Sequence, residues 1–220
     1  MLFDLRGRGR RRTVQVVYLG LALLIGAGLV LFGVGTGTGG GGLLNGIGNS
    51  GSGNQNSVVS QQEKAALKQV KANPNDPAAY SALVQARWTS AGQGANFNSQ
   101  TGQFTASGKK KLAQATQAWQ QYLNLTKTPD PNLAVLASRA YAAQGNYAGA
   151  ASGWEIAAAA NPNAAKGYEC LAVSAYAAKQ TRKGDLAMAK AIDLAPKAQR
   201  ALLKTTIQSA KTNPAVAQQC

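Results

Sequence analysis

The side chains that most often carry out chemistry are scarce in this sequence, and histidine is missing from all 220 residues. Without histidine, the chain has no imidazole to act as a general base, to complete a catalytic triad or to bind a metal ion. Its eight acidic residues are scattered, and no pair has a spacing that favours acid–base catalysis. Asp76, Asp130 and Asp185 are instead typical of turns or helix starts. We therefore expect no enzyme activity, no catalytic residue, no metal site and no cofactor.

The two cysteines, Cys170 and Cys220, are too far apart in the chain for a CxxC redox or zinc motif. If this part of the chain lies outside the cytoplasm, they could form one disulfide that holds the C-terminal tail and closes a loop of about 50 residues. The alternative is that Cys170 is a small packed residue and Cys220 a free thiol in the tail. The sequence leaves both interpretations open.

Charge divides the chain into three parts. Residues 1–13 form a basic head with five arginines and one acid, and no charged residue occurs between Arg12 and Glu63. The rest of the chain carries 18 of the 23 basic residues and 7 of the 8 acids, so it is basic as well. A basic body is attracted to anionic surfaces, but its cations are dispersed and no nucleic-acid-binding motif accompanies them. We expect no nucleic acid partner.

Residues 14–34 predict a transmembrane helix. They are apolar apart from Gln15, and at about 1.5 Å per residue they span roughly 30 Å, the thickness of a bilayer core. The arginines before this span place the N-terminus in the cytoplasm and the body outside it, in a bacterial cytoplasmic membrane crossed once. A cleaved signal peptide is the rival interpretation, although its apolar region is usually about 7 to 15 residues long.

Residues 35–57 are rich in Gly, Asn and Ser and have neither helical nor strand periodicity, which predicts a flexible linker. The body, residues 58–220, begins with a Ser60-to-Glu63 capping-box pattern that predicts the start of a leading helix. A closing helix is expected after Pro196.

The fold of the body is indicated by an internal repeat. Pro162 and Pro196 are 34 residues apart, and small, aromatic and glycine residues precede each at recurring offsets. The first unit carries Ala137, Ser138, Tyr141, Gly145, Ala150, Trp154 and Ala157; the second carries Tyr168, Leu171, Ala172, Gly184, Met188 and Ala191, with Tyr176 one place later than expected.

This pattern resembles the tetratricopeptide repeat over roughly residues 74–196. The resemblance implies an all-α solenoid of about 2.5 to 3 helix hairpins with capping helices, after the single N-terminal transmembrane helix. A degenerate unit is expected to start after Pro74 and to carry an insertion at 92–108, where Phe97 and Phe104 flank a polar stretch. This stretch indicates a small β-hairpin or an ordered loop.

In this family the first helices of successive units line a concave groove that binds proteins. Carried over residue by residue, the groove positions are Gln85, Trp88, Val135, Arg139, Glu169, Val173 and Tyr176. The alternative for Trp88 and Tyr176 is a place in the core, which is the more frequent role of an aromatic residue on a helix. The family's best-known clamp for a C-terminal carboxylate is absent, because Ser81, Gln85 and Val135 occupy its positions.

We therefore expect a membrane-tethered, extracytoplasmic scaffold for protein–protein interaction. Two alternatives remain open. One is an ancillary, chaperone-like subunit beside the Sec translocon; the other is a cell-envelope assembly factor that binds an anionic polymer.

Overall fold

The computed structural model describes residues 52–220. The expected basic head, the transmembrane helix at 14–34 and most of the linker lie outside these residues. Within the described range, no helix combines the length and the apolar character needed to cross a bilayer.

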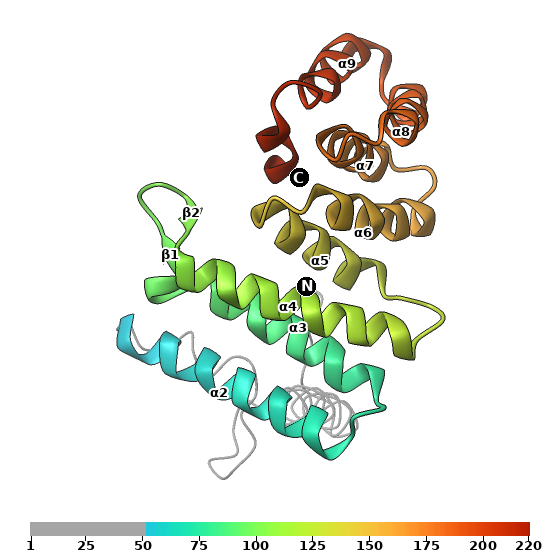
Figure 1. The fold of residues 1–220 in the computed structure, drawn as a ribbon. Helices are drawn as coiled ribbons and strands as arrows, with labels where there is room; N and C mark the ends of the chain where they lie inside the picture. The colour runs from blue at the N-terminus through green and yellow to red at the C-terminus, as the bar shows by residue number, and fades with distance from the viewer. Residues whose placement is uncertain (1–51) are drawn as a thin grey trace, which may run out of the picture. The chain divides into compact units, whose positions relative to one another are not determined.

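The described chain is built from α-helices, so the all-α expectation is confirmed for this part (Figure 1). Eight α-helices occur between residues 52 and 220, with three short 3-10 helices and one small antiparallel hairpin. The α-helices are α2 (Ser52–Ala72), α3 (Pro77–Ala91), α4 (Ala106–Leu125), α5 (Pro131–Ala143), α6 (Tyr147–Ala160), α7 (Ala165–Ala177), α8 (Thr181–Leu194) and α9 (Arg200–Ser209). The shorter elements are η1 (Gly94–Asn96), β1 (Phe97–Asn98), β2 (Gln103–Phe104), η2 (Lys197–Gln199) and η3 (Pro214–Gln219).

Consecutive helices pair into hairpins, and the hairpins stack on one another. α3 packs with α4, α5 with α6, and α7 with α8, while α4–α5 and α6–α7 contacts join neighbouring pairs. The last two hairpins repeat with a 34-residue interval: α5 begins at Pro131 and α7 at Ala165, while α6 begins at Tyr147 and α8 at Thr181. The spacing of the prolines in the sequence therefore corresponds to a spacing of helices.

Local sequence explains where several helices begin. Asp76 and Asp130 each precede a proline at the first helical turn, and their carboxylates accept backbone N–H groups at 2.9 and 2.8 Å. Such caps satisfy donors that the helix itself leaves unpaired. Both aspartates are helix-start residues as expected. Asp185 is not, because it lies inside α8 and accepts a hydrogen bond from the Tyr176 hydroxyl.

A tyrosine packed on a glycine holds each of the last two hairpins together. A Cβ at Gly149 would come within 2.7 Å of the Tyr141 ring, and a Cβ at Gly184 would come within 2.5 Å of the Tyr176 ring. Tyr176 is one place later than a strict 34-residue repeat requires, and its glycine is also one place later. Because the tyrosine and the glycine are both shifted by one place, the second of these two hairpins keeps the same contact between ring and glycine.

The leading helix starts earlier than predicted. α2 begins at Ser52, inside the stretch expected to be linker, so Ser60 lies within the helix and does not cap it. The longer helix carries Val59 into a buried position beside the end of α3, a tertiary contact that the local capping pattern does not contain.

Glu63 ties α2 to the first hairpin. Its carboxylate is 8% exposed, accepts a hydrogen bond from Lys111 Nζ of α4 at 2.7 Å and lies 3.7 Å from Arg87 Nε of α3. Arg87 also donates to the main-chain oxygen of Gln114 at 2.8 Å. Burial lowers the pKa of the Arg87 guanidinium from its ordinary value, and Glu63 opposes that shift. The Glu63 carboxylate therefore stabilises the charged form of the half-buried Arg87.

We expect Glu63→Gln to lower the free energy of unfolding by about 3 kcal/mol, because it leaves Arg87 buried without a counter-charge. Urea denaturation of the full chain in detergent measures this. The matched control is Glu155→Gln, which removes the exposed Glu155–Lys183 pair and should cost less than about 1 kcal/mol. Equal losses in the two variants would contradict a structural role for the Glu63 ion pairs.

The ends of α5 and α7 allow a reciprocal test. Gly145 (φ 76°) and Lys179 (φ 60°) occupy equivalent positions, both in the left-handed region that favours glycine. We expect Gly145→Lys to lower the free energy of unfolding by about 1 kcal/mol. Lys179→Gly should raise it by a smaller amount, because it also removes the exposed hydrogen bond from Lys179 Nζ to the Lys211 carbonyl. Gly92→Ala, at φ −84° beyond α3, is the control and should change little. A loss of stability in Lys179→Gly would contradict this account.

Candidate functional site

A cavity of about 490 Å³ lies beside the insertion, and we call it the hairpin cavity. It lies between the β1–β2 hairpin, the ends of α3 and α5, and the C-terminal segment, which project on the same side of the stacked helices (Figure 1). The residues that line it are Trp88, Gly102, Gln103, Phe104, Lys109, Arg139, Ala143, Gln218, Gln219 and Cys220.

The insertion at 92–108 supplies one wall as an ordered β-hairpin. Phe97 pairs with Phe104 across the two strands, and their rings meet edge to face at 5.2 Å. Asn98 accepts the backbone N–H groups of Gln100 and Thr101, and Gly102 has φ 67°, so the tip is a tight turn. The possible hairpin is therefore confirmed.

The hairpin is fastened to the helices at its base. Thr105 caps α4 by accepting the Gly108 N–H at 3.3 Å and donates to the Ala95 carbonyl at 2.8 Å. Asn96 donates through its side chain to the carbonyl of Ser90 at 2.8 Å. Phe104 also lies 6.2 Å from the Trp88 ring, above a small apolar cluster of Ala91, Leu112 and Ala140. Trp88 and Phe104 are thus held as a fixed aromatic wall.

Two cations complete the cavity. Lys109 comes from the first turns of α4 and Arg139 from α5, and none of the described residues that line the cavity is acidic. Lys109 and Lys111 belong to one run of three lysines, yet Lys111 pairs with Glu63, which lies away from the cavity. Two residues apart on a helix point in nearly opposite directions, which separates their roles.

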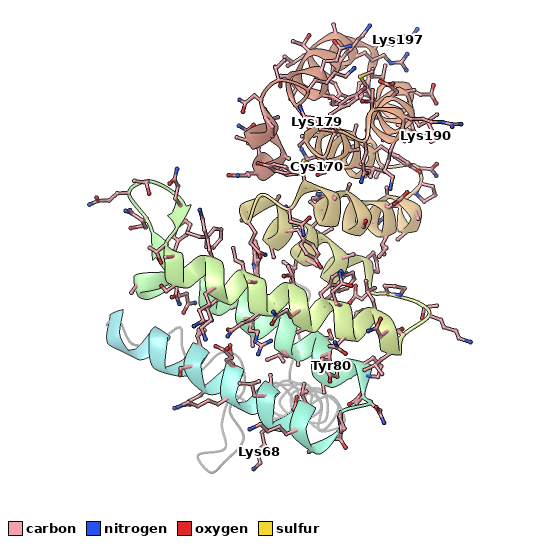
Figure 2. All side chains as sticks on the ribbon, in the orientation of Figure 1. Lys68, Tyr80, Cys170, Lys179, Lys190 and Lys197 are labelled. Carbon is pink, nitrogen blue, oxygen red and sulfur yellow. A yellow bond between two sulfur atoms is a disulfide. The ribbon has the colours of Figure 1, made fainter. Side chains whose placement is uncertain are left out.

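The chain's own C-terminal segment covers one side of α5 and α7, which we call the inner face. A disulfide joins Cys170 of α7 to Cys220, and η3 packs on α7 and α5 (Figure 2 shows where Cys170 lies). Arg139 Nε donates to the main-chain oxygen of Cys220 at 2.9 Å. Of the two interpretations of the cysteines, the structure contains the disulfide.

This arrangement changes the expected groove. Val173 and Tyr176 are only 1% and 2% exposed, so the expectation that they face an open groove is wrong. They belong to a buried cluster that also contains Ile207 of α9 and Ala217 of η3, and Val135 packs against the same cluster. Val135, Val173 and Tyr176 lie on the side of α5 and α7 on which the C-terminal elements pack. These elements occupy the space in which an open groove was expected.

The remaining predicted positions are spread along the face. Gln85 is exposed, and Glu169 is half-buried beside Lys166 with a 3.0 Å ion pair. Of the predicted groove positions, Trp88 and Arg139 line one cavity, which Phe104 of the insertion also lines. Phe97 contacts the Phe104 ring edge to face. Sequence reasoning missed Lys109 and the glutamines at 218 and 219; the lysine run at 109–111 was the available signal for the first.

Comparison with protein families, with curated proteins and with solved structures finds no match for this chain. The site is therefore interpreted from its own geometry.

We expect Gly108→Ala to loosen the hairpin, because a Cβ at this buried position would collide with the main-chain oxygen of Asn96. Overpacking of this kind costs about 1 to 3 kcal/mol. Urea denaturation measures the loss, and the tryptophan fluorescence of the chain, to which Trp88 contributes, should change as Phe104 moves. Lys110→Ala, at an exposed position of the same helix, is the control. An unchanged stability and spectrum in Gly108→Ala would contradict the packing of the insertion against α4.

Proposed function

We propose that this chain is a membrane-tethered scaffold of the tetratricopeptide class, outside the cytoplasm of a bacterium, that binds a segment of a partner protein at the hairpin cavity. The observation that carries the proposal is the convergence of Trp88, Phe104 and Arg139 from three separate elements on one cavity. Large aromatic rings and arginines are the side chains that most often anchor protein interfaces.

The regular stacking of the helices supports the repeat class. Helix hairpins at a 34-residue interval are what the resemblance implies. The tyrosine packed on a glycine in each of the last two hairpins agrees with repeated units. Stacked units of this kind present an extended inner face, which suits an elongated polypeptide segment better than a compact small molecule.

The disulfide supports the proposed compartment. Structural disulfides persist in oxidising surroundings and are rare in the reducing cytoplasm. The Cys170–Cys220 bond therefore agrees with a body outside the cytoplasm, on the far side of the proposed anchor at 14–34. A fusion reporter that places residue 220 in the cytoplasm would contradict the topology.

An anionic partner is favoured by the charge of the cavity. Lys109 and Arg139 line it, and none of its described lining residues is acidic. Binding to an acidic envelope polymer remains a second candidate, because exposed lysines such as Lys68, Lys190 and Lys197 project from separate helices (Figure 2). A role beside the Sec translocon is a special case of protein binding, distinguished by which protein is captured.

A photo-crosslinking residue at Gln103 tests the protein-binding proposal in native membranes. Gln103 lines the cavity and its side chain is exposed, whereas Gln117 is an exposed position on α4 outside it and serves as the control. We expect discrete protein adducts from position 103 only. Arg139→Gln or Trp88→Ala should reduce these adducts about 5-fold or more, as loss of an interface anchor does, whereas Lys190→Gln should leave them unchanged.

Two outcomes would contradict the protein-binding proposal. Equal adducts from positions 103 and 117 would mean that the cavity selects nothing. Absence of protein adducts, together with co-sedimentation with acidic cell-wall polymer that is lost at about 0.5 M salt, would favour the polymer candidate instead.

A further inference from the structure

The C-terminal segment is held as a ligand would be held. Its last turn, η3, lies across α7 and α5, the two first helices of the final hairpins. Ala217 is 1% exposed in the cluster with Val173 and Tyr176, and Arg139 binds a main-chain oxygen of the segment. The contacts are made to a small apolar side chain and to the backbone, which many polypeptides could supply.

The same segment limits the hairpin cavity. Gln218, Gln219 and Cys220 form its wall on the side of α7, and Arg139 touches both the cavity and the segment. If the segment left, the cavity would extend along the inner face to the part of the apolar cluster that Ala217 now covers. The occupied half and the open half are therefore parts of one potential groove.

We propose that the Cys170–Cys220 disulfide is a redox latch, and that its reduction releases residues 212–220 and opens this groove to a partner segment of the same kind. That partner is a polypeptide with small apolar side chains, such as Ala and Val, next to a main-chain carbonyl for Arg139. This inference rests on the proposed function, because it assigns regulation and a partner class to the same site.

The chemistry is thiol–disulfide exchange with a dithiol reductant. Cys170 is fully buried, whereas Cys220 is partly exposed and lines the cavity, so the attacking thiolate reaches Cys220 Sγ. A mixed disulfide forms at Cys220, the S–S bond breaks, and Cys170 leaves as a thiolate that takes up a proton. The second thiol of the reductant then displaces Cys220, so the dithiol is oxidised while two electrons and two protons reach the protein.

The contacts at Lys211 define the hinge. Lys211 Nζ lies 4.3 Å from the centre of the Tyr176 ring and 3.7 Å from Asp185, and Lys179 donates to the Lys211 carbonyl at 3.2 Å. These contacts do not involve the disulfide and survive its reduction. Beyond them, Thr212 and Asn213 donate their backbone N–H groups to the Ser209 carbonyl at the end of α9. The other described contacts of the segment are the Arg139 hydrogen bond and the packing of Val216, Ala217 and Cys220 on the apolar cluster. Reduction therefore frees a short tail and leaves α9 in place.

Alkylation of Cys170 tests the latch without any partner. The full chain carrying Cys220→Ser is purified in detergent, and its single thiol is treated with N-ethylmaleimide in native and in denaturing conditions. We expect the native rate to lie within about 100-fold of the denatured rate, as for a site exposed by frequent local opening. A slower native rate would overturn the latch, because the tail would then cover Cys170 without the bond.

Arg139→Gln in the Cys220→Ser background should leave the alkylation rate unchanged, as Lys190→Gln should, because the released tail no longer accepts the Arg139 hydrogen bond. An acceleration of about 5-fold, the effect of one lost hydrogen bond, would mean that the tail stays docked without the disulfide and would overturn the latch. As a check on folding, hydrogen exchange of the unmutated chain is compared before and after dithiothreitol. Exchange should rise in residues 212–220 and stay unchanged in α3 and α4. Protection of 212–220 after full reduction would also overturn the proposal.

The partner class is tested with a peptide copy of the tail, KTNPAVAQQC, which carries the sequence of residues 211–220. Mixed with the Cys220→Ser chain under mild oxidation, it should form a disulfide with Cys170, at least about 10-fold more than a scrambled peptide ending in Cys. Equal capture of both peptides would contradict the partner class. Fast alkylation with no protein adducts at position 103 in either redox state would instead leave the latch standing and remove the proposed function.

Discussion

The close approach of paired helices is the constraint on which this structure depends. In each of the last two hairpins a tyrosine ring lies where the facing helix has a glycine, with no room for a Cβ. That contact sets the angle and distance within a hairpin, and α6–α7 packing carries it to the next. Because the hairpins are placed in this way, α5 and α7 both contact the same C-terminal segment, η3.

That shared occupant makes the inner face different from an open repeat groove. Apolar positions on first helices are buried because the chain folds its own C-terminal elements against them. The segment beyond Lys211 is held by the packing of Val216 and Ala217, by the Arg139 hydrogen bond and by the Cys170–Cys220 disulfide. In the proposed latch, the state of the two cysteines determines whether the groove is open.

The first hairpin, formed by α3 and α4, differs from the others in its long connecting loop. Ordering an insertion of this length costs conformational entropy, which contacts within the loop and with the helices must offset. The strand pairing of Phe97 with Phe104, the Thr105 cap and the Trp88 contact provide them. The buried Glu63 carboxylate holds α2 against the same hairpin through Arg87 and Lys111. A rigid base of this kind lets a surface loop present aromatic side chains in a constant orientation.

Much of the helical architecture follows from local sequence. Aspartate followed by proline begins α3 and α5, and the 34-residue recurrence of small and aromatic residues predicts paired helices, because these features act over one or two helical turns. Even the hairpin in the insertion was open to prediction from its phenylalanines and glycine. The site could be predicted only in part. Residue type singled out Trp88, Arg139 and Phe104, but nothing in the sequence placed them around a single cavity.

What only the tertiary structure decided were the contacts between segments distant in the chain. The sequence left the state of Cys170 and Cys220 undecided, because a disulfide depends on how closely the fold brings two residues 50 positions apart. The start of α2 at Ser52 depends on the burial of Val59 beside α3, which no local cap signals. Val173 and Tyr176 have the same helical periodicity whether solvent or the C-terminal elements cover them. Periodicity reports which face of a helix points inward, and only packing determines what lies against that face.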